Sequence, residues 1–187
     1  MKKLAILMLL ALEIAVCSCG TSSPSTTVTT STTGNWEAQL TGGTGAASQL
    51  NFVTAFTFTV NSGASVPLDI TGFSFINAGA CFANGVNGST ETGSATVTVS
   101  STNQVTGGMT YTVTSQTTAG TVLTLTSANG LTGTSNGTTG TTGTLTNGVV
   151  VGTWSLSSSD TNCIGTNTSP VMGTFLMCQG AATCTVP

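Results

Sequence analysis

Hydrophobic and polar residues alternate with a period of two along most of the chain from Gly34 onward. In the segment 35–40, Trp36, Ala38 and Leu40 share one phase, and polar side chains take the other. The same alternation recurs in the segments 51–60, 94–100, 108–115, 121–127, 149–157 and 171–179. Because successive side chains of a β-strand point to opposite faces, this pattern predicts a series of strands that each bury one face.

The segment 68–76 breaks this phase. Leu68 and Ile70 fall on one face, but the next large side chains, Phe73 and Phe75, fall on the other. One inserted residue at Gly72 restores the alternation. We therefore predict a β-bulge there, where glycine accepts unusual backbone angles.

Turn sequences such as Asn-Ser-Gly at 61–63 and Asn-Gly at 147–148 separate the expected strands. The segments follow one another roughly every 8–14 residues through short connections, which favours antiparallel neighbours. No segment after residue 20 shows helical periodicity. We predict an all-β domain, a single antiparallel up-and-down barrel of about 8–10 strands, with a two-sheet β-sandwich as the alternative.

The first residues have the features of an export signal. Lys2 and Lys3 precede nine apolar residues, 4–12, which are too few to span a bilayer. The sequence Val16-Cys17-Ser18-Cys19 follows, and it resembles the lipobox of bacterial lipoproteins. The resemblance implies cleavage before Cys19 and attachment of lipid to its sulfur, with ordinary secretion as the alternative.

This interpretation divides the chain into three parts. Residues 1–18 are expected to be the lipoprotein signal peptide, 19–33 a lipidated and disordered tether rich in Ser and Thr, and 34–187 the all-β domain. The expected location is the cell envelope, on the periplasmic or the exposed face of the outer membrane. The resemblance to bacterial lipoproteins implies the outer membrane, because Gly20, and not Asp, follows Cys19.

Beyond the signal the chain carries no cationic side chain. The sequence has two Lys or Arg residues, Lys2 and Lys3, and it contains no His. Nucleic-acid binding depends on Lys and Arg contacts to phosphate, so we expect no nucleic-acid partner. Because the chain has no His, nucleophilic catalysis with a histidine base is excluded. Zinc sites with histidine ligands are excluded as well. We expect no cofactor and no metal.

Four cysteines remain for the domain: Cys81, Cys163, Cys178 and Cys184. In an exported chain this number suggests two disulfides, and three pairings are possible. The short span between Cys178 and Cys184 allows a local bridge, which would leave Cys81 and Cys163 to join two distant loops. A four-thiolate metal site would need Cys-x-x-Cys pairs, which are absent.

The acids of the domain are the only groups left for acid–base catalysis. Glu37 and Asp69 fall on outward phases of expected strands, whereas Glu91 and Asp160 are expected in loops. A glycosidase would need two of them about 5–9 Å apart, and we interpret all four as surface charges. We therefore predict no enzymatic activity and no catalytic residue.

Two kinds of side chain could bind sugars. Outward threonines in the segments 95–99, 111–115 and 123–127 could form a hydroxyl-rich face, although threonine also favours strands in general. Trp36, Tyr111 and Trp154 could stack on sugar rings, but all three fall on inward phases and are expected in the core.

Several short motifs occur in order along the domain: Gly34-Asn35-Trp36, Cys81, Gly152-Thr153-Trp154, Asn162-Cys163 and Gly173-Thr174-Phe175. The first resembles the Gly-x-Trp opening strand of lipocalin-like barrels. The whole arrangement is similar to that of small, uncharacterised envelope lipoproteins of the acidobacterial type. This resemblance implies a barrel and an envelope location, and it implies no activity.

The expected function is a structural or interaction role, without catalysis, at the membrane surface. The membrane itself is the expected partner through the lipid anchor, together with an envelope protein, a glycan or a small apolar ligand. The alternative is a barrel that binds a small apolar ligand or a carbohydrate. A hydrolase that uses two carboxylates is a distant third.

Overall fold

The computed structural model describes residues 35–59, 63–83, 88–135, 142–143, 145–166 and 169–180. The expected signal peptide (1–18), the tether (19–33) with its Cys19, and Cys184 lie outside the described residues.

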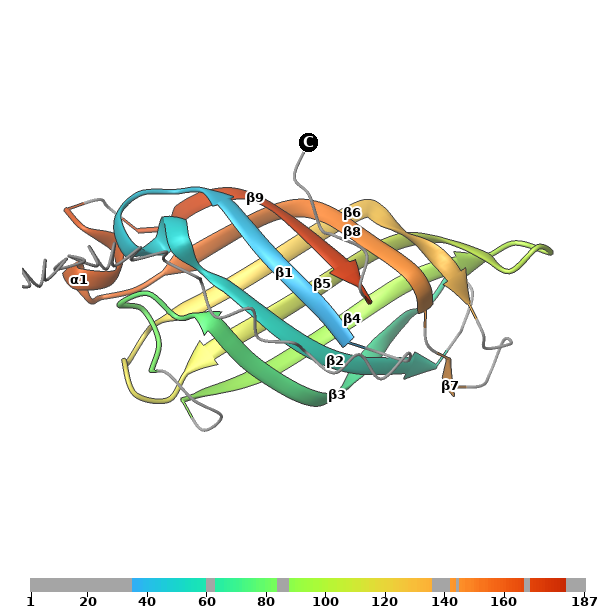
Figure 1. The fold of residues 1–187 in the computed structure, drawn as a ribbon, viewed down its shortest axis with the longest axis horizontal. Coiled ribbons are helices and arrows are strands. Elements are labelled where there is room, and N and C mark those ends of the chain that lie inside the picture. The colour runs from blue at the N-terminus through green and yellow to red at the C-terminus, as the bar shows by residue number, and fades with distance from the viewer. Residues whose placement is uncertain are drawn as a thin grey trace, which may run out of the picture.

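The described strands form a closed barrel. They are β1 (Asn35–Gly42), β2 (Asn51–Thr59), β3 (Ser65–Asn77), β4 (Ser89–Val99), β5 (Gln104–Ser115), β6 (Val122–Ser135), β7 (Thr142–Gly143), β8 (Leu145–Ser157) and β9 (Val171–Gln179). Eight of them pair antiparallel in the order β1-β9-β8-β6-β5-β4-β3-β2, and β1 also pairs with β2, which closes the sheet. The two residues of β7 pair with the end of β2. The prediction of an up-and-down barrel is confirmed, and the sandwich is not formed (Figure 1).

The alternating pattern decides which side chains enter the barrel. Trp36, Ala38 and Leu40 of β1 are buried, and the residues between them are half-buried. The inward phases of the other strands supply the remaining core, including Phe52, Phe56, Met109, Tyr111, Val113, Leu123, Leu125, Trp154, Leu156, Phe175 and Met177. One period-two pattern therefore accounts for most of the core.

The expected bulge lies between β2 and β3. The register passes from Ala55 opposite Gly72 to Phe56 opposite Ile70, which leaves Thr71 without a partner on β2. The prediction at Gly72 is confirmed, but its stated reason is wrong. Gly72 does not have a positive φ, and an added Cβ would meet only the Ala55 Cβ at 3.7 Å.

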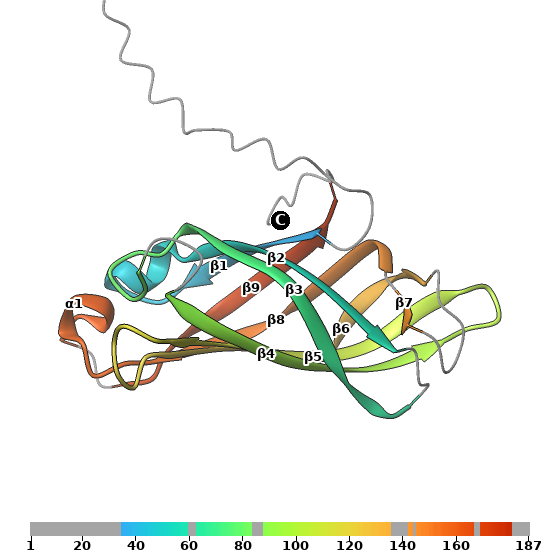
Figure 2. The ribbon, with the colours of Figure 1, turned by 90° about the horizontal axis from the view of Figure 1, so that it is seen from below.

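Two single-turn helices interrupt the strands: the 3-10 helix η1 (Gly45–Gln49) and α1 (Thr161–Ile164). Both are too short to give a helical period in the sequence. The Asp160 side chain caps α1, because its Oδ1 accepts a hydrogen bond from the Asn162 N–H at 2.8 Å. The two helices lie side by side at one end of the barrel (Figures 1 and 2).

The loop after β3 packs at the same end. Ala78, Cys81 and Phe82 in this loop are buried, and Phe82 stacks on Phe75 of β3 at a centroid distance of 4.7 Å. A disulfide joins Cys81 to Cys163 in α1, 82 residues further along the chain. The bridge therefore fixes the β3–β4 connection to the β8–β9 connection. Among the described residues, no helix has the length and apolar character needed to cross a bilayer.

Candidate functional site

The interior of the barrel is packed with aromatic side chains. Trp36 stacks on Phe56 with ring centroids 5.1 Å apart, and Phe52 stacks on Tyr111 at 5.7 Å. Phe73 of β3 contacts both Phe52, at 5.0 Å, and Tyr111, at 6.5 Å. Contacts of this kind reach from β1 across β2 and β3 to β5, so aromatic side chains occupy this part of the barrel interior, where a lipocalin-like ligand would otherwise sit.

Tyr111 places a polar group within this core. Its hydroxyl lies 2.7 Å from the Thr54 Oγ1, and the Thr54 hydroxyl donates to the Gly72 carbonyl oxygen at 3.0 Å. Because the single Thr54 hydroxyl proton is used in this bond, Tyr111 donates to Thr54. The Gly72 carbonyl oxygen is the final acceptor of this pair of hydrogen bonds. Burial raises the pKa of Tyr111 well above its usual value; the Thr54 hydrogen bond opposes this shift, and the nearby Glu91 charge adds to it.

The two tryptophans pack against glycines on other strands, Trp154 of β8 against Gly173 of the neighbouring β9 and Trp36 of β1 against Gly148 of β8. The Trp154 indole Nε1 donates to the Thr41 carbonyl oxygen at 2.9 Å. A Cβ on Gly173 would lie 2.6 Å from the same Nε1, and a Cβ on Gly148 would overlap the Trp36 ring. Both indoles are at most 2% exposed. Trp36, Tyr111 and Trp154 are thus core residues, as their phases predict, and no sugar can stack on them.

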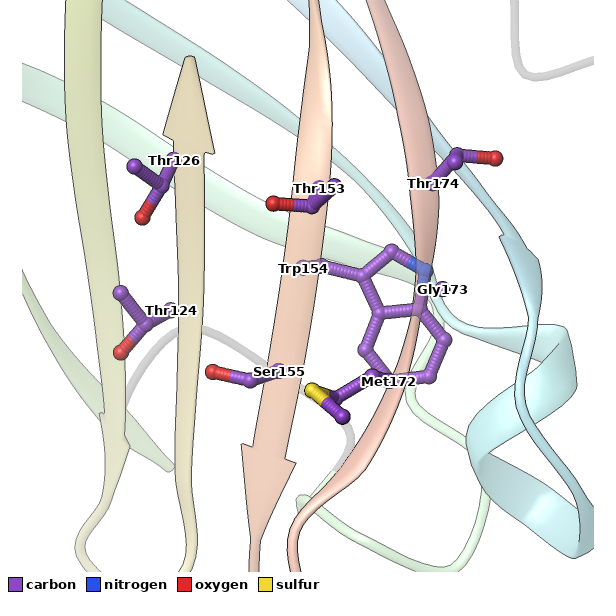
Figure 3. A pocket seen from close by; sticks show the side chains of 8 residues that line it. All are labelled: Thr124, Thr126, Thr153, Trp154, Ser155, Met172, Gly173 and Thr174. Carbon is purple, nitrogen blue, oxygen red and sulfur yellow. The ribbon is translucent and has the colours of Figure 1, made fainter. Parts of the chain in front are cut away.

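A shallow hollow of about 500 Å³ lies on the outer face of β6, β8 and β9. We call it the hydroxyl groove. Its lining includes the exposed Thr126, Thr153, Met172 and Thr174 and the half-buried Thr124 and Ser155 (Figure 3). These side chains include no charged group, and the Met172 side chain is 65% exposed. The buried Trp154 extends behind this surface toward β9 (Figure 3).

The groove combines residues that sequence analysis found with residues that it missed. Thr124 and Thr126 belong to the expected outward threonine rows. Thr153 and Thr174 were named only within short motifs and Ser155 was not named, although each lies on the polar phase of its strand. The pairing of β8 between β6 and β9 brings the three rows together, and sequence spacing gives no sign of that order.

The four acids are distributed over separate elements. Glu37 on β1 lies opposite Val53 of β2, and Asp69 on β3 lies opposite Thr57 of the same strand. Four residues along β2 separate them by about 13 Å, which is wider than a glycosidase pair requires. Among the described residues, no cluster of three or more Asp, Glu, Cys or His side chains could hold a metal ion.

The placement of Glu91 differs from the expected loop. It lies within β4, where its partner on β5 is Val113. Gly93, two residues further along β4, is a strand residue over which Leu68 packs; an added Cβ would lie 2.7 Å from the Leu68 Cδ1. Glu91 shares the inward phase of the buried Ala95 and is half-buried. Its Oε1 accepts a hydrogen bond from the Ser89 hydroxyl at 2.6 Å.

The described cysteines agree with a disulfide framework. Cys81 and Cys163 are paired, although Cys163 lies in α1 and not in a loop. Cys178, at a buried position on β9, is also disulfide-bonded. Cys184 lies outside the described residues.

Comparison with known proteins adds no relative from which a role could be transferred. No protein-family profile, no curated protein and no solved structure matches this chain.

Proposed function

We propose that this chain is a lipid-anchored protein of the cell envelope whose barrel has a structural or interaction role without catalysis. The packed aromatic interior is the observation that carries the proposal. Phe52, Phe73 and Tyr111 contact one another inside the barrel, so contacts with other molecules fall to the outer surface and the strand edges.

The disulfide supports a location outside the cytosol. Cys81 and Cys163 are both fully buried and joined, and structural disulfides persist mainly in oxidising compartments. The lipobox-like sequence that ends at Cys19 would supply the membrane anchor. Several acyl chains on one cysteine would hold the protein at a membrane surface, since each buried methylene contributes about 0.8 kcal/mol.

The test combines cell fractionation with intact-mass analysis of the native full-length gene product. We expect a membrane-bound protein that begins at Cys19, carries added acyl mass and changes mass on reduction and alkylation. The Cys19→Ser variant should lose the acyl mass and leave the membrane fraction. The matched Cys17→Ser variant should keep both. An uncleaved cytosolic chain with free thiols would refute the proposal.

The hydroxyl groove favours a second candidate function, the binding of a neutral carbohydrate. Its volume of about 500 Å³ falls in the range of small-molecule sites. Its rows of hydroxyls are uncharged, and the exposed Met172 offers an apolar surface beside them. A glycan without charged groups fits this lining better than an anionic one.

Saturation-transfer NMR with neutral oligosaccharides tests this second function. Thr153→Val keeps the shape of the side chain and removes its hydroxyl, so it should reduce the transferred signal. Thr98→Val, at an exposed position of β4 far around the barrel, is the matched control and should not. Equal signals from the two variants would exclude the groove as a sugar site.

A further inference from the structure

The seam between β3 and β4 has the fewest paired residues of any junction between the eight strands of the barrel. These strands pair only through Ser65–Pro67 on β3 and Ser94–Thr96 on β4. From Leu68 to Asn77, β3 pairs with β2 alone, and from Ser89 to Gly93, β4 pairs with β5 alone. Figure 2 shows the two strands diverging beyond their short contact. We call these two stretches the open edges.

Among the described residues, the open edges have no second strand paired to them. Each strand of a barrel normally uses the N–H and C=O groups of both its sides, and an unpaired edge is a template for another strand. In the described part of the chain, no loop or turn makes a backbone hydrogen bond to residues 68–77. An added strand could therefore pair with this length of β3.

The side chains at the seam restrict what such a strand could carry. β3 contributes Ile70, Phe73 and Phe75, which are partly buried against the core, and Ile76, which is 45% exposed. Together they form an apolar border. Phe75 is already stacked on Phe82 of the following loop, so a strand with apolar residues at alternate positions would cover Ile70 and Phe73, as in other complexes formed by strand addition.

The opposite border carries a charge. Glu91 lies on the open edge of β4, on its inward phase, and is half-buried with the Ser89 hydroxyl as hydrogen-bond donor. No residue from 35 to 187 is Lys, Arg or His. A second copy of the domain therefore has no cation to offer Glu91, whereas a strand from another protein could supply one.

We propose that the seam is an acceptor site for an extended segment of another polypeptide, with alternate apolar residues and a Lys or Arg that meets Glu91. The segment pairs antiparallel with β3, because β3 has the longer open edge and antiparallel pairing is the more stable arrangement. This inference deepens the proposed interaction function, on which it rests, by naming the class of partner.

The first measurement is amide hydrogen exchange of the purified full-length protein. Residues 68–77 and 89–93 should exchange faster than the fully paired centre of β5, since part of their amides lack a partner strand. Exchange as slow as that of β5 would show that the edges are already covered, and the proposal would fall. Slow exchange caused by dimerisation would give the site to a second copy and would overturn it equally.

The second measurement is the binding of a labelled ten-residue peptide of alternating Val and Thr with one central Lys, followed by fluorescence anisotropy. Binding should slow exchange in both open edges. Glu91→Gln should weaken binding about fivefold, and Glu37→Gln on β1 should leave it unchanged. A peptide with Glu in place of Lys, and one with alternate amides N-methylated, should bind more weakly still.

The proposal is overturned if the Lys peptide, with Lys moved through every position, does not bind at about 1 mM. It is also overturned if binding is insensitive to N-methylation or to Glu91→Gln. These outcomes concern the seam alone. Membrane location and acylation at Cys19 are read in a separate experiment, so failure here can be told apart from failure of the proposed envelope function.

Discussion

Tyr111 allows the packed interior to be tested by titration. It is the only tyrosine of the chain, so the ultraviolet absorbance of tyrosinate reports this one side chain. The side chain is fully buried, and burial is the main cause that raises its pKa. In the unfolded chain the same hydroxyl should ionise near the ordinary value of about 10.

The sign of the effect on stability follows from this difference. Tyr111 binds its proton more tightly in the folded protein than in the unfolded chain. Its contribution to the free energy of unfolding is therefore fully present below the pKa that Tyr111 has in the unfolded chain. Above about pH 10 the unfolded chain gains free energy by ionising, and the folded protein does not. The free energy of unfolding should then fall by up to about 1.4 kcal/mol per pH unit until the folded pKa is reached.

The assay has two parts. An absorbance titration in native buffer should show no tyrosinate at the pH where the same protein in urea shows half ionisation. Urea unfolding between about pH 8 and about pH 11 should show the loss of stability. Tyr111→Phe is the control, because it cannot ionise and its stability should lack this decline. The packing argument would be refuted if native Tyr111 titrated as it does in urea, or if both proteins lost stability equally.

Three further predictions concern stability, each measured by urea or thermal unfolding. Thr54→Val should cost about 1–3 kcal/mol of stability because it leaves the buried Tyr111 hydroxyl without an acceptor. The double variant with Tyr111→Phe should cost less than the sum of the two single changes, by at least about 0.5 kcal/mol. Strict additivity would contradict the hydrogen bond. Gly173→Ala should cost about 1–3 kcal/mol of stability because its Cβ would overlap the Thr41 carbonyl oxygen and approach the Trp154 indole. As the control, Gly72→Ala should change stability by less than about 0.5 kcal/mol. Similar effects at the two glycines would refute this account. The double change of Cys81 and Cys163 to Ala should cost about 4–5 kcal/mol, since the bridge closes a span of 82 residues; an unchanged unfolding midpoint would show that the disulfide does not constrain the unfolded chain.

Much of the barrel could be predicted because alternation is a local property. A strand places every second side chain on the same face whatever its neighbours are, so Trp36, Tyr111 and Trp154 could be assigned to the core before any pairing was known. The bulge at Gly72 was predictable for the same reason, since an extra residue shifts the phase of all that follow it.

The candidate sites could not be predicted in the same way. Thr124, Thr153 and Thr174 lie on three strands, and only the order β6-β8-β9 makes them one surface. Glu91 was expected in a loop, but it lies within β4, where Gly93 makes room for Leu68. A glycine needed for close packing and a glycine needed for a turn look identical in a sequence.

By itself, the sequence determined the strand class, the faces of the strands and the absence of cationic side chains from the domain, because each of these depends only on residue identity and local spacing. The tertiary structure alone decided that Phe52 meets Tyr111 inside the barrel, that Cys81 meets Cys163, and that β3 separates from β4 after Pro67. These features depend on which distant segments pack together, and packing is decided by the shape of the whole barrel, which no local pattern contains.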